Sequence, residues 1–211
     1  MARKRDDSIT GRVGDRIHST WRGRPYTRAY PETVHNPQTE AQQAHRNAFA
    51  ALSRLSSNMK AAHSIGLDYQ ANRMKLNTHC AFKKLNKVFV TDQVIRYPLL
   101  ILSKGPVTSF EITKVRLEGQ TLHVDFDGKR YDFHAYDLDN IYMFAYCADL
   151  CQGSLFEPSF RVVGSISGEI PSEWIGPSLH LYFFAIDPKR RASETIHVGF
   201  EEMEIVSKAE Y

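Results

Sequence analysis

Two segments of this 211-residue chain, 141–147 and 179–186, carry apolar residues at both alternating positions, and this pattern constrains the fold more than any other feature. A strand with one face in water alternates apolar and polar residues, so a strand that is apolar on both faces is buried on both. Short apolar runs separated by turn residues surround the two segments, which indicates an all-β unit beyond residue 87. We therefore expect both segments to be central strands.

Five further candidate strands raise the total to seven, the number that a minimal β-sandwich uses. They are residues 98–103, 110–117, 121–126, 160–167 and 195–205. Glu118-Gly119 and Asp127-Gly128 are turn signals, and the second also fits a tight hairpin. The expected fold class is α+β and mainly β, with a seven-stranded antiparallel sandwich of the immunoglobulin or fibronectin type III kind.

One long and one short helix are predicted before the sandwich. Asn36 can cap the long helix, and Pro37 suits its first turn. Apolar residues then recur at spacings of four and three as far as Ala62, and Gly66 supplies a stop signal. The short helix is predicted at about 77–86. The expected organisation is a basic arm or β-hairpin over residues 1–35, a helical segment over 36–94 and the sandwich over 95–211.

Positive charge is concentrated at the front of the chain. Residues 1–60 hold eleven Lys and Arg against five Asp and Glu, a surplus of six, whereas the whole chain has a formal charge of +3. Segments 13–21 and 25–30 can pair as a hairpin across residues 22–24, and an extended arm fits equally well. The candidate interaction residues in this arm are Arg12, Arg16, Trp21, Arg22, Arg24, Tyr26, Arg28 and Tyr30.

The mixture of arginine with Trp and Tyr supports three interpretations. These residue types are enriched at the hot spots of protein interfaces, which favours a protein-interaction arm. Guanidinium groups for phosphate and rings for stacking would also suit a nucleic-acid strand. A hairpin that only packs locally is the third interpretation.

Several motifs resemble one known family. They include Gly11-Arg12-Val13-Gly14, Trp21-Arg22-Gly23-Arg24 and the stretch 36–43, together with 179–184 and 196–199 near the other end. The family is a group of uncharacterised proteins, mainly from Bacteroidetes, catalogued as a domain of unknown function. The resemblance implies an architecture and no activity. A stretch similar to residues 36–43 occurs in proteins of phage-like or structural kind, which suggests a structural role.

No motif for catalysis is present in the sequence. The segment Gly164-Ser165-Ile166-Ser167-Gly168 places Ile where a nucleophile elbow needs Ser. A phosphate loop and a dinucleotide fingerprint are both absent from the sequence. We therefore predict that the chain is not an enzyme, that it has no catalytic residues and that it uses no cofactor.

Two clusters of potential metal ligands lack the spacing of a metal site. The acidic cluster lacks EF-hand spacing and consists of Asp125, Asp127, Asp132, Asp137 and Asp139. The His and Cys candidates show no tightly spaced pair and are His123, His134, His180, His197, Cys147 and Cys151. We predict no metal and no disulfide, because two cysteines four residues apart on a strand are about 13 Å apart.

The leading hypothesis is a non-enzymatic structural or protein-interaction component of a larger, phage-like assembly, whose N-terminal arm docks on neighbouring subunits of a homo- or hetero-oligomer. A nucleic-acid-binding protein is one alternative, and a sandwich that binds a glycan or ligand through loops containing Trp174 or Tyr136 is another. The N-terminus lacks the apolar region of a signal peptide, and no run reaches membrane-spanning length. We expect cytoplasmic synthesis, incorporation in a virion or other particle, and no membrane partner.

Overall fold

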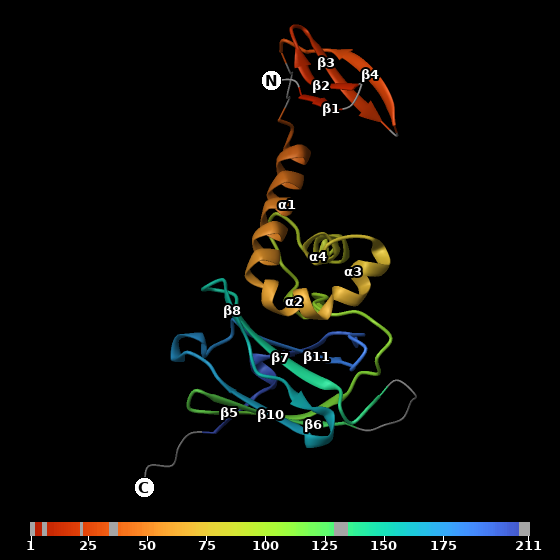
Figure 1. Cartoon of the computed structure of the whole chain (residues 1–211). Helices are drawn as coiled ribbons and strands as arrows, with labels where there is room; N and C mark the ends of the chain where they lie inside the picture. The colour runs from red at the N-terminus through yellow and green to blue at the C-terminus, as the bar shows by residue number, and fades with distance from the viewer. Residues whose placement is uncertain (1–2, 6–7, 22, 34–37, 129–134, 207–211) are drawn as a thin grey trace. The chain divides into compact units, whose positions relative to one another are not determined.

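The computed structural model describes residues 3–5, 8–21, 23–33, 38–128 and 135–206. The chain divides into two compact units, Met1–Glu40 and Ala41–Tyr211 (Figure 1). The first unit contains one four-stranded sheet, and the second contains helices and two sheets of four and five strands.

The first unit is a four-stranded antiparallel sheet with the strand order β1-β2-β3-β4. Its strands are β1 (Arg3–Arg5), β2 (Ser8–Val13), β3 (Arg16–Trp21) and β4 (Arg24–Ala29). The expected hairpin is confirmed as the pair of β3 and β4, in which Trp21 lies opposite Arg24. Two strands that the sequence did not predict, β1 and β2, complete the sheet.

Four α-helices follow in the described part of the chain: α1 (Glu40–Asn58), α2 (Lys60–Gly66), α3 (Asp68–Met74) and α4 (Thr78–Asn86). The expectation of one long and one short helix is therefore corrected. The long helix bends at Met59, whose backbone leaves helical geometry at φ −95° and ψ 15°. The apolar period continues across this bend because α1 and α2 face the same core, so the pattern did not reveal it.

The short helix is confirmed as α4. The side chain of Asn77 accepts a hydrogen bond from the N–H of Cys80 at 2.7 Å, which is a regular N-cap. The predicted start of the long helix at Asn36 and Pro37 lies outside the described residues.

Gly66 ends α2 without ending the helical part of the chain, because α3 begins at Asp68. A Cβ atom at Gly66 would lie 2.5 Å from the carbonyl oxygen of Leu102 and 2.8 Å from the Cβ of Ser103. The glycine therefore permits a close approach of two backbone segments.

The second unit contains two sheets. One has the order β10-β6-β5-β13 and the other has β12-β11-β7-β8, with β9 also paired to β7. The strands are β5 (Glu111–Glu118), β6 (Thr121–Asp127), β7 (Asn140–Cys147), β8 (Gln152–Leu155), β9 (Ser159–Phe160), β10 (Ser165–Glu169), β11 (Leu179–Ile186), β12 (Ile196–Gly199) and β13 (Glu204–Val206).

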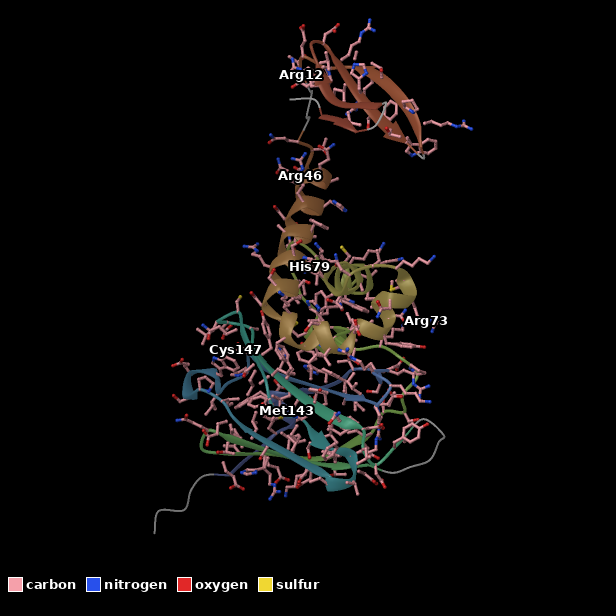
Figure 2. All side chains as sticks on the ribbon, in the orientation of Figure 1. Arg12, Arg46, Arg73, His79, Met143 and Cys147 are labelled. Carbon is pink, nitrogen blue, oxygen red and sulfur yellow. The ribbon has the colours of Figure 1, made fainter. Side chains whose placement is uncertain are left out.

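Two cores explain why β7 and β11 are apolar on both faces. Ile141, Met143 and Leu181 point into a core between the two sheets, where they meet Val115 and Val124 of the other sheet. Figure 2 shows Met143 in this inner layer.

The other face of β7 and β11 meets the helices. Phe144 and Tyr182 lie in a second core with Leu55 of α1, Met59 and Phe82 of α4. Within this unit the helices therefore form a third layer over the sheet of β7 and β11 (Figure 1). The interpretation of both segments as central strands is confirmed.

The segment 98–103 was predicted as a strand and is not one. It contains the short 3₁₀ helix η1 (Tyr97–Leu99) and then an irregular stretch. Side chains satisfy its backbone: Asn86 accepts from the N–H of Ile101 at 2.7 Å, and the Thr195 hydroxyl accepts from Leu102 at 2.9 Å. Leu100 and Leu102 are buried, but these side-chain bonds replace a strand ladder.

Two other predicted strands are interrupted by single 3₁₀ turns. η2 (Arg161–Val163) separates β9 from β10, and η4 (Phe200–Glu202) separates β12 from β13. A further 3₁₀ helix, η3 (Ser172–Trp174), precedes β11.

The mixed, mainly β class is confirmed, whereas the finer seven-stranded immunoglobulin-like arrangement is not confirmed. In the described part of the chain the two sheets contain nine strands, and β13 pairs with β5 in the parallel direction. No helix among the described residues is both long and apolar enough to cross a membrane.

Candidate interaction surface

The strand register of the N-terminal sheet decides which arm residues share a face. Directly paired residues of neighbouring strands lie on the same face, and successive residues alternate between faces. On one face the pairs between β3 and β4 are Ile17 with Arg28, Ser19 with Tyr26, and Trp21 with Arg24. Arg12 of β2 pairs with Ile17 and so joins them.

Tyr30 extends this face beyond the end of β4. Its N–H donates to the carbonyl oxygen of Asp15 at 2.6 Å, which continues the ladder. The guanidinium carbon of Arg12 lies 3.6 Å from the centroid of the Tyr30 ring, a cation–π contact (Figure 2 labels Arg12). The guanidinium Nε of Arg12 also donates to the carbonyl oxygen of Gly14 at 2.9 Å. These contacts hold a cation and a ring at one end of the face.

We call this surface the arginine–aromatic face. It consists of Arg12, Ile17, Ser19, Trp21, Arg24, Tyr26, Arg28 and Tyr30. The opposite face carries His18 and Thr27, and the Thr27 hydroxyl forms a hydrogen bond of 2.9 Å with Nδ1 of His18. Arg16 pairs with Ala29 and belongs to that opposite face.

The rings of the arginine–aromatic face are open to solvent. Trp21 is 64% exposed, Tyr26 45% and Tyr30 38%. No residue of 1–40 whose side chain the structure describes is buried, and neither hydrophobic core contains one of them. A sheet of this size needs a packed apolar face for independent stability, and the described side chains of this sheet do not supply one.

Pro25 fits β4 because β4 is an edge strand. The bond between Tyr30 and Asp15 sets the ladder, so that even-numbered residues of β4 bond to β3 and odd-numbered residues direct their backbone groups outward. The missing N–H of Pro25 therefore falls on the outer side, where it removes no ladder bond. Pro25 is therefore compatible with the hairpin of β3 and β4.

Six of the eight arm residues singled out from the sequence lie together on the arginine–aromatic face. Arg16 lies on the other face, and Arg22 lies outside the described residues. Sequence reasoning missed Ile17 and Ser19, which complete the face from β3. The signal that could have found the face is the spacing of two between positions 24, 26, 28 and 30.

The histidine and cysteine candidates do not gather into one site. His180 Nδ1 and His197 Nε2 lie 3.1 Å apart, whereas Nε2 of His123 lies 3.9 Å from Glu118. Cys147 is buried between the sheets, and Cys151 is exposed. Position 134 lies outside the described residues.

Burial and then the neighbouring His197 lower the pKa of His180 to about 4, so the two rings form a neutral hydrogen-bonded pair at pH 7. The described residues contain no group of three or more His, Cys, Asp or Glu side chains that could hold a metal ion.

The acidic cluster is divided between separate ion pairs. Asp125 pairs with Arg116 at 2.8 Å on the outer surface of its sheet. Asp139 is fully buried and pairs with Arg161 at 3.0 Å. Position 132 lies outside the described residues.

The remaining candidate residues from the sequence, Ile166, Trp174 and Tyr136, belong to the second unit. Ile166, which replaces the serine of a nucleophile elbow, is buried in the core between the sheets. Trp174 is only 5% exposed and belongs to the same core, so its ring is not available to a glycan. Tyr136 is 43% exposed.

Residues 8–199 match the model of a family of unknown function, DUF6266. The chain belongs to this family. The DUF6266 match starts at the first residue of β2 and so includes the whole arginine–aromatic face together with all four α-helices. The expected resemblance to a domain of unknown function is confirmed at this level. No curated protein and no solved structure matches the chain.

Proposed function

We propose that the chain is a non-enzymatic structural or protein-interaction component of a larger assembly, and that the arginine–aromatic face docks on a neighbouring protein subunit. A virion or phage-like particle is one such assembly. The observation that carries the proposal is the exposure of three aromatic rings on a sheet that has no buried side chain among its described residues.

The exposed rings supply a substantial part of an interface. Taking each side chain at its usual full area, the exposed fractions of Trp21, Tyr26 and Tyr30 leave roughly 350 Å² of ring surface in water. A standard interface covers about 800 Å² on each partner. The three rings therefore provide nearly half of that area, and they belong to the residue types that dominate hot spots.

The charge of the face indicates the chemistry of the partner. Arg12, Arg24 and Arg28 lie on it, and Asp15 lies opposite Tyr30 at one end of it, so that arginines outnumber acidic residues among its described members. Guanidinium groups bind carboxylates in paired hydrogen bonds, which Lys cannot reproduce. The face is therefore suited to a protein surface that presents Asp and Glu around an apolar centre.

A nucleic acid is the second candidate, favoured by the alternation of arginines and rings along β4. This is the arrangement that binds phosphates and stacks bases. We rank it second because residues 1–40 hold eight Lys and Arg against five Asp and Glu, a modest surplus. A partner that covers rings and buries apolar area also replaces the missing core better than a phosphate backbone does.

The experiment places a photo-crosslinking phenylalanine derivative in the full chain, in its native cell. One variant carries it in place of Tyr26 on the arginine–aromatic face, and the control carries it in place of Thr27 on the opposite face. Adducts are separated by size, tested for protease and nuclease sensitivity, and identified by mass spectrometry.

Protease-sensitive adducts from position 26 and none from position 27 would support docking on a protein. Nuclease-sensitive adducts from position 26 would instead support the second candidate. Absence of adducts from position 26, or equal yields from both positions, would contradict the proposed surface.

Arginine variants give a matched test of the same surface. Arg28→Ala removes a guanidinium from the arginine–aromatic face, and Arg16→Ala removes one from the opposite face of the same sheet. We expect Arg28→Ala to lower the molar mass of the native species in light scattering and Arg16→Ala to leave it unchanged. A monomeric wild-type chain would contradict self-assembly, so that the cross-linked partner would have to be another protein.

The nucleic-acid alternative has its own measurement. If the three arginines of the face bound phosphates of a single strand, the logarithm of affinity would fall with the logarithm of salt concentration with a slope of about −2. No retention on DNA or RNA columns at low salt would exclude this alternative.

A further inference from the structure

A second feature of the molecule lies far from the sheet face in sequence and belongs entirely to the second unit. It is a pocket of about 330 Å³ between α1 and the neighbouring sheet. Its walls include Ala51, Arg54, Leu55, Ile95, Tyr97 and Tyr146. The volume is at the lower end of the range of small-molecule sites, which suits a ligand of one or two rings.

Helical spacing creates one wall of the pocket. Ala51, Leu55 and Asn58 recur at intervals of four and three and so share one face of α1, and Arg54 lies beside them. Leu55 is buried in the core shared with the sheet, so this part of α1 is held against β7. The pocket therefore has a firm aliphatic side.

Two tyrosines form the aromatic side of the pocket, with ring centroids 5.9 Å apart. Tyr146 comes from β7 and is 1% exposed as a whole residue. Tyr97 is fixed from behind, because His180 stacks on its ring at 4.5 Å and the Tyr182 hydroxyl donates to its carbonyl oxygen at 3.0 Å. The rings are thus in place before a ligand arrives.

The polar groups of the pocket favour a negative charge on the ligand. Arg54 is its one charged lining residue, and it forms no ion pair within the described part of the chain. Burial raises the pKa of both Tyr97 and Tyr146 further above neutral pH, so both phenols are protonated, and the Tyr146 phenol also forms a hydrogen bond with the side chain of Asn58. The pocket offers donors and a cation but no carboxylate.

We propose that this pocket binds a small organic anion, whose apolar or aromatic body lies against Tyr97 and Tyr146 and whose carboxylate or sulfonate group is bound by Arg54. This is the usual composition of a ligand site, namely apolar walls with a few polar groups that fix orientation. The proposal does not depend on the arginine–aromatic face, so either can fail without the other.

The first test uses naphthalene-2-sulfonate as the probe and the full chain, with binding followed by NMR titration. We expect Arg54→Gln to weaken binding about tenfold, because one charge-assisted contact is lost. Arg73→Gln is the matched control, since Arg73 is an exposed arginine on α3 that does not line the pocket (Figure 2). The neutral analogue 2-naphthalenemethanol should bind more weakly than the sulfonate and should not distinguish wild type from Arg54→Gln.

The second test locates the probe. The exposed thiol of Cys151 also lines the pocket, so alkylation of Cys151 reports its occupancy. The measurement is made in a Cys80→Ser background, because Cys80 is exposed as well. Saturating naphthalene-2-sulfonate should slow alkylation of Cys151 several-fold, and Ala51→Phe, which fills the pocket, should remove this protection.

Three results would overturn the proposal. They are no binding of the sulfonate at millimolar concentration, equal affinity of wild type and Arg54→Gln, and alkylation of Cys151 at an unchanged rate in the presence of bound probe. Ala51→Phe is interpreted only together with Arg54→Gln. Because Arg54 is exposed, Arg54→Gln should leave the fold intact.

Discussion

Replacing Arg161 by Met removes the cation of a buried ion pair. Arg161 is 1% exposed and Asp139 is 0% exposed, and the guanidinium Nε lies 3.0 Å from the carboxylate. The same guanidinium donates to the carbonyl oxygen of Thr108 at 2.6 Å. The pair therefore joins the start of β7, the turn η2 and the segment before β5.

The expected cost of Arg161→Met is about 3–5 kcal/mol, the usual range when one partner of a buried pair is removed. Asp139 would keep the hydrogen bond from the N–H of Tyr136 at 3.0 Å but would lose its countercharge. The double variant Asp139→Asn with Arg161→Met should cost only about 1 kcal/mol. The pair is incompletely satisfied, since Nη1 of Arg161 and Oδ1 of Asp139 have no hydrogen-bond partner among the described residues.

The assay is urea unfolding followed by the fluorescence of Trp174. The chain has two tryptophans, of which Trp21 is 64% exposed and Trp174 is 5% exposed. A Trp21→Phe background therefore makes the signal specific to the second unit. For a unit of this size each kcal/mol lowers Tm by about 2–4 °C, so Arg161→Met should lower it by roughly 6–20 °C.

Two results would refute this reasoning. One is that Arg161→Met lowers the free energy of unfolding by less than about 1 kcal/mol while the slope of that free energy against urea concentration is unchanged. The pair would then contribute no more to stability than a surface ion pair does. The other is additivity of the two single substitutions, because a true pair must show a coupling energy in the double-mutant cycle.

Three further predictions concern the second unit. The pKa of His180 is about 4 in the folded chain and near 6.5 when unfolded, so stability is lost as pH falls from about 6.5 toward 4. His180→Gln should flatten this part of the plot of unfolding free energy against pH, and parallel plots for the wild type and the variant would contradict the prediction. Thr195→Val should cost about 2 kcal/mol in urea unfolding, because two backbone N–H groups of the segment 100–103 lose their acceptor, and a neutral result would show that water replaces the hydroxyl. Gly66→Ala should cost about 1–3 kcal/mol through overpacking, whereas Gly176→Ala, where a Cβ meets nothing within 4 Å, should be nearly neutral.

Local patterns in the sequence located several elements with good accuracy. The strands β6, β7 and β11 begin and end within a residue of the predicted segments, and α4 has the expected bounds. β6 has a period of two, β7 and β11 are continuous apolar runs bounded by turn residues, and α4 has an N-cap, and each of these signals is set by near neighbours in the chain. The composition of the arm also indicated which residues are candidates for interaction, although it could not divide Arg12 and Arg16 between two faces.

Long-range contacts decided the rest. The predicted long helix is divided into α1 and α2 because the chain bends at Met59 while its apolar spacing continues toward the same core, and α3 begins after Gly66. The two interruptions of predicted strands by 3₁₀ turns likewise left no break in the apolar pattern. The apolar pattern of a sequence indicates which side chains are buried, but it does not indicate which backbone groups form hydrogen bonds with each other.

The sequence by itself determined that two strands are buried on both faces, that helices precede a β-rich body, and that arginines and rings gather in an N-terminal arm or hairpin. Only the tertiary structure decided what covers those strands and which arm residues lie together. The apolar pattern of a strand can be recognised from neighbouring positions in the sequence, because each side chain is apolar or polar according to the layer that its own face of the strand meets. Register and backbone partners depend on distant segments. The Thr195 hydroxyl accepts the hydrogen bond of the Leu102 N–H, 93 positions away, and this bond takes the place of a strand pairing in the segment 98–103.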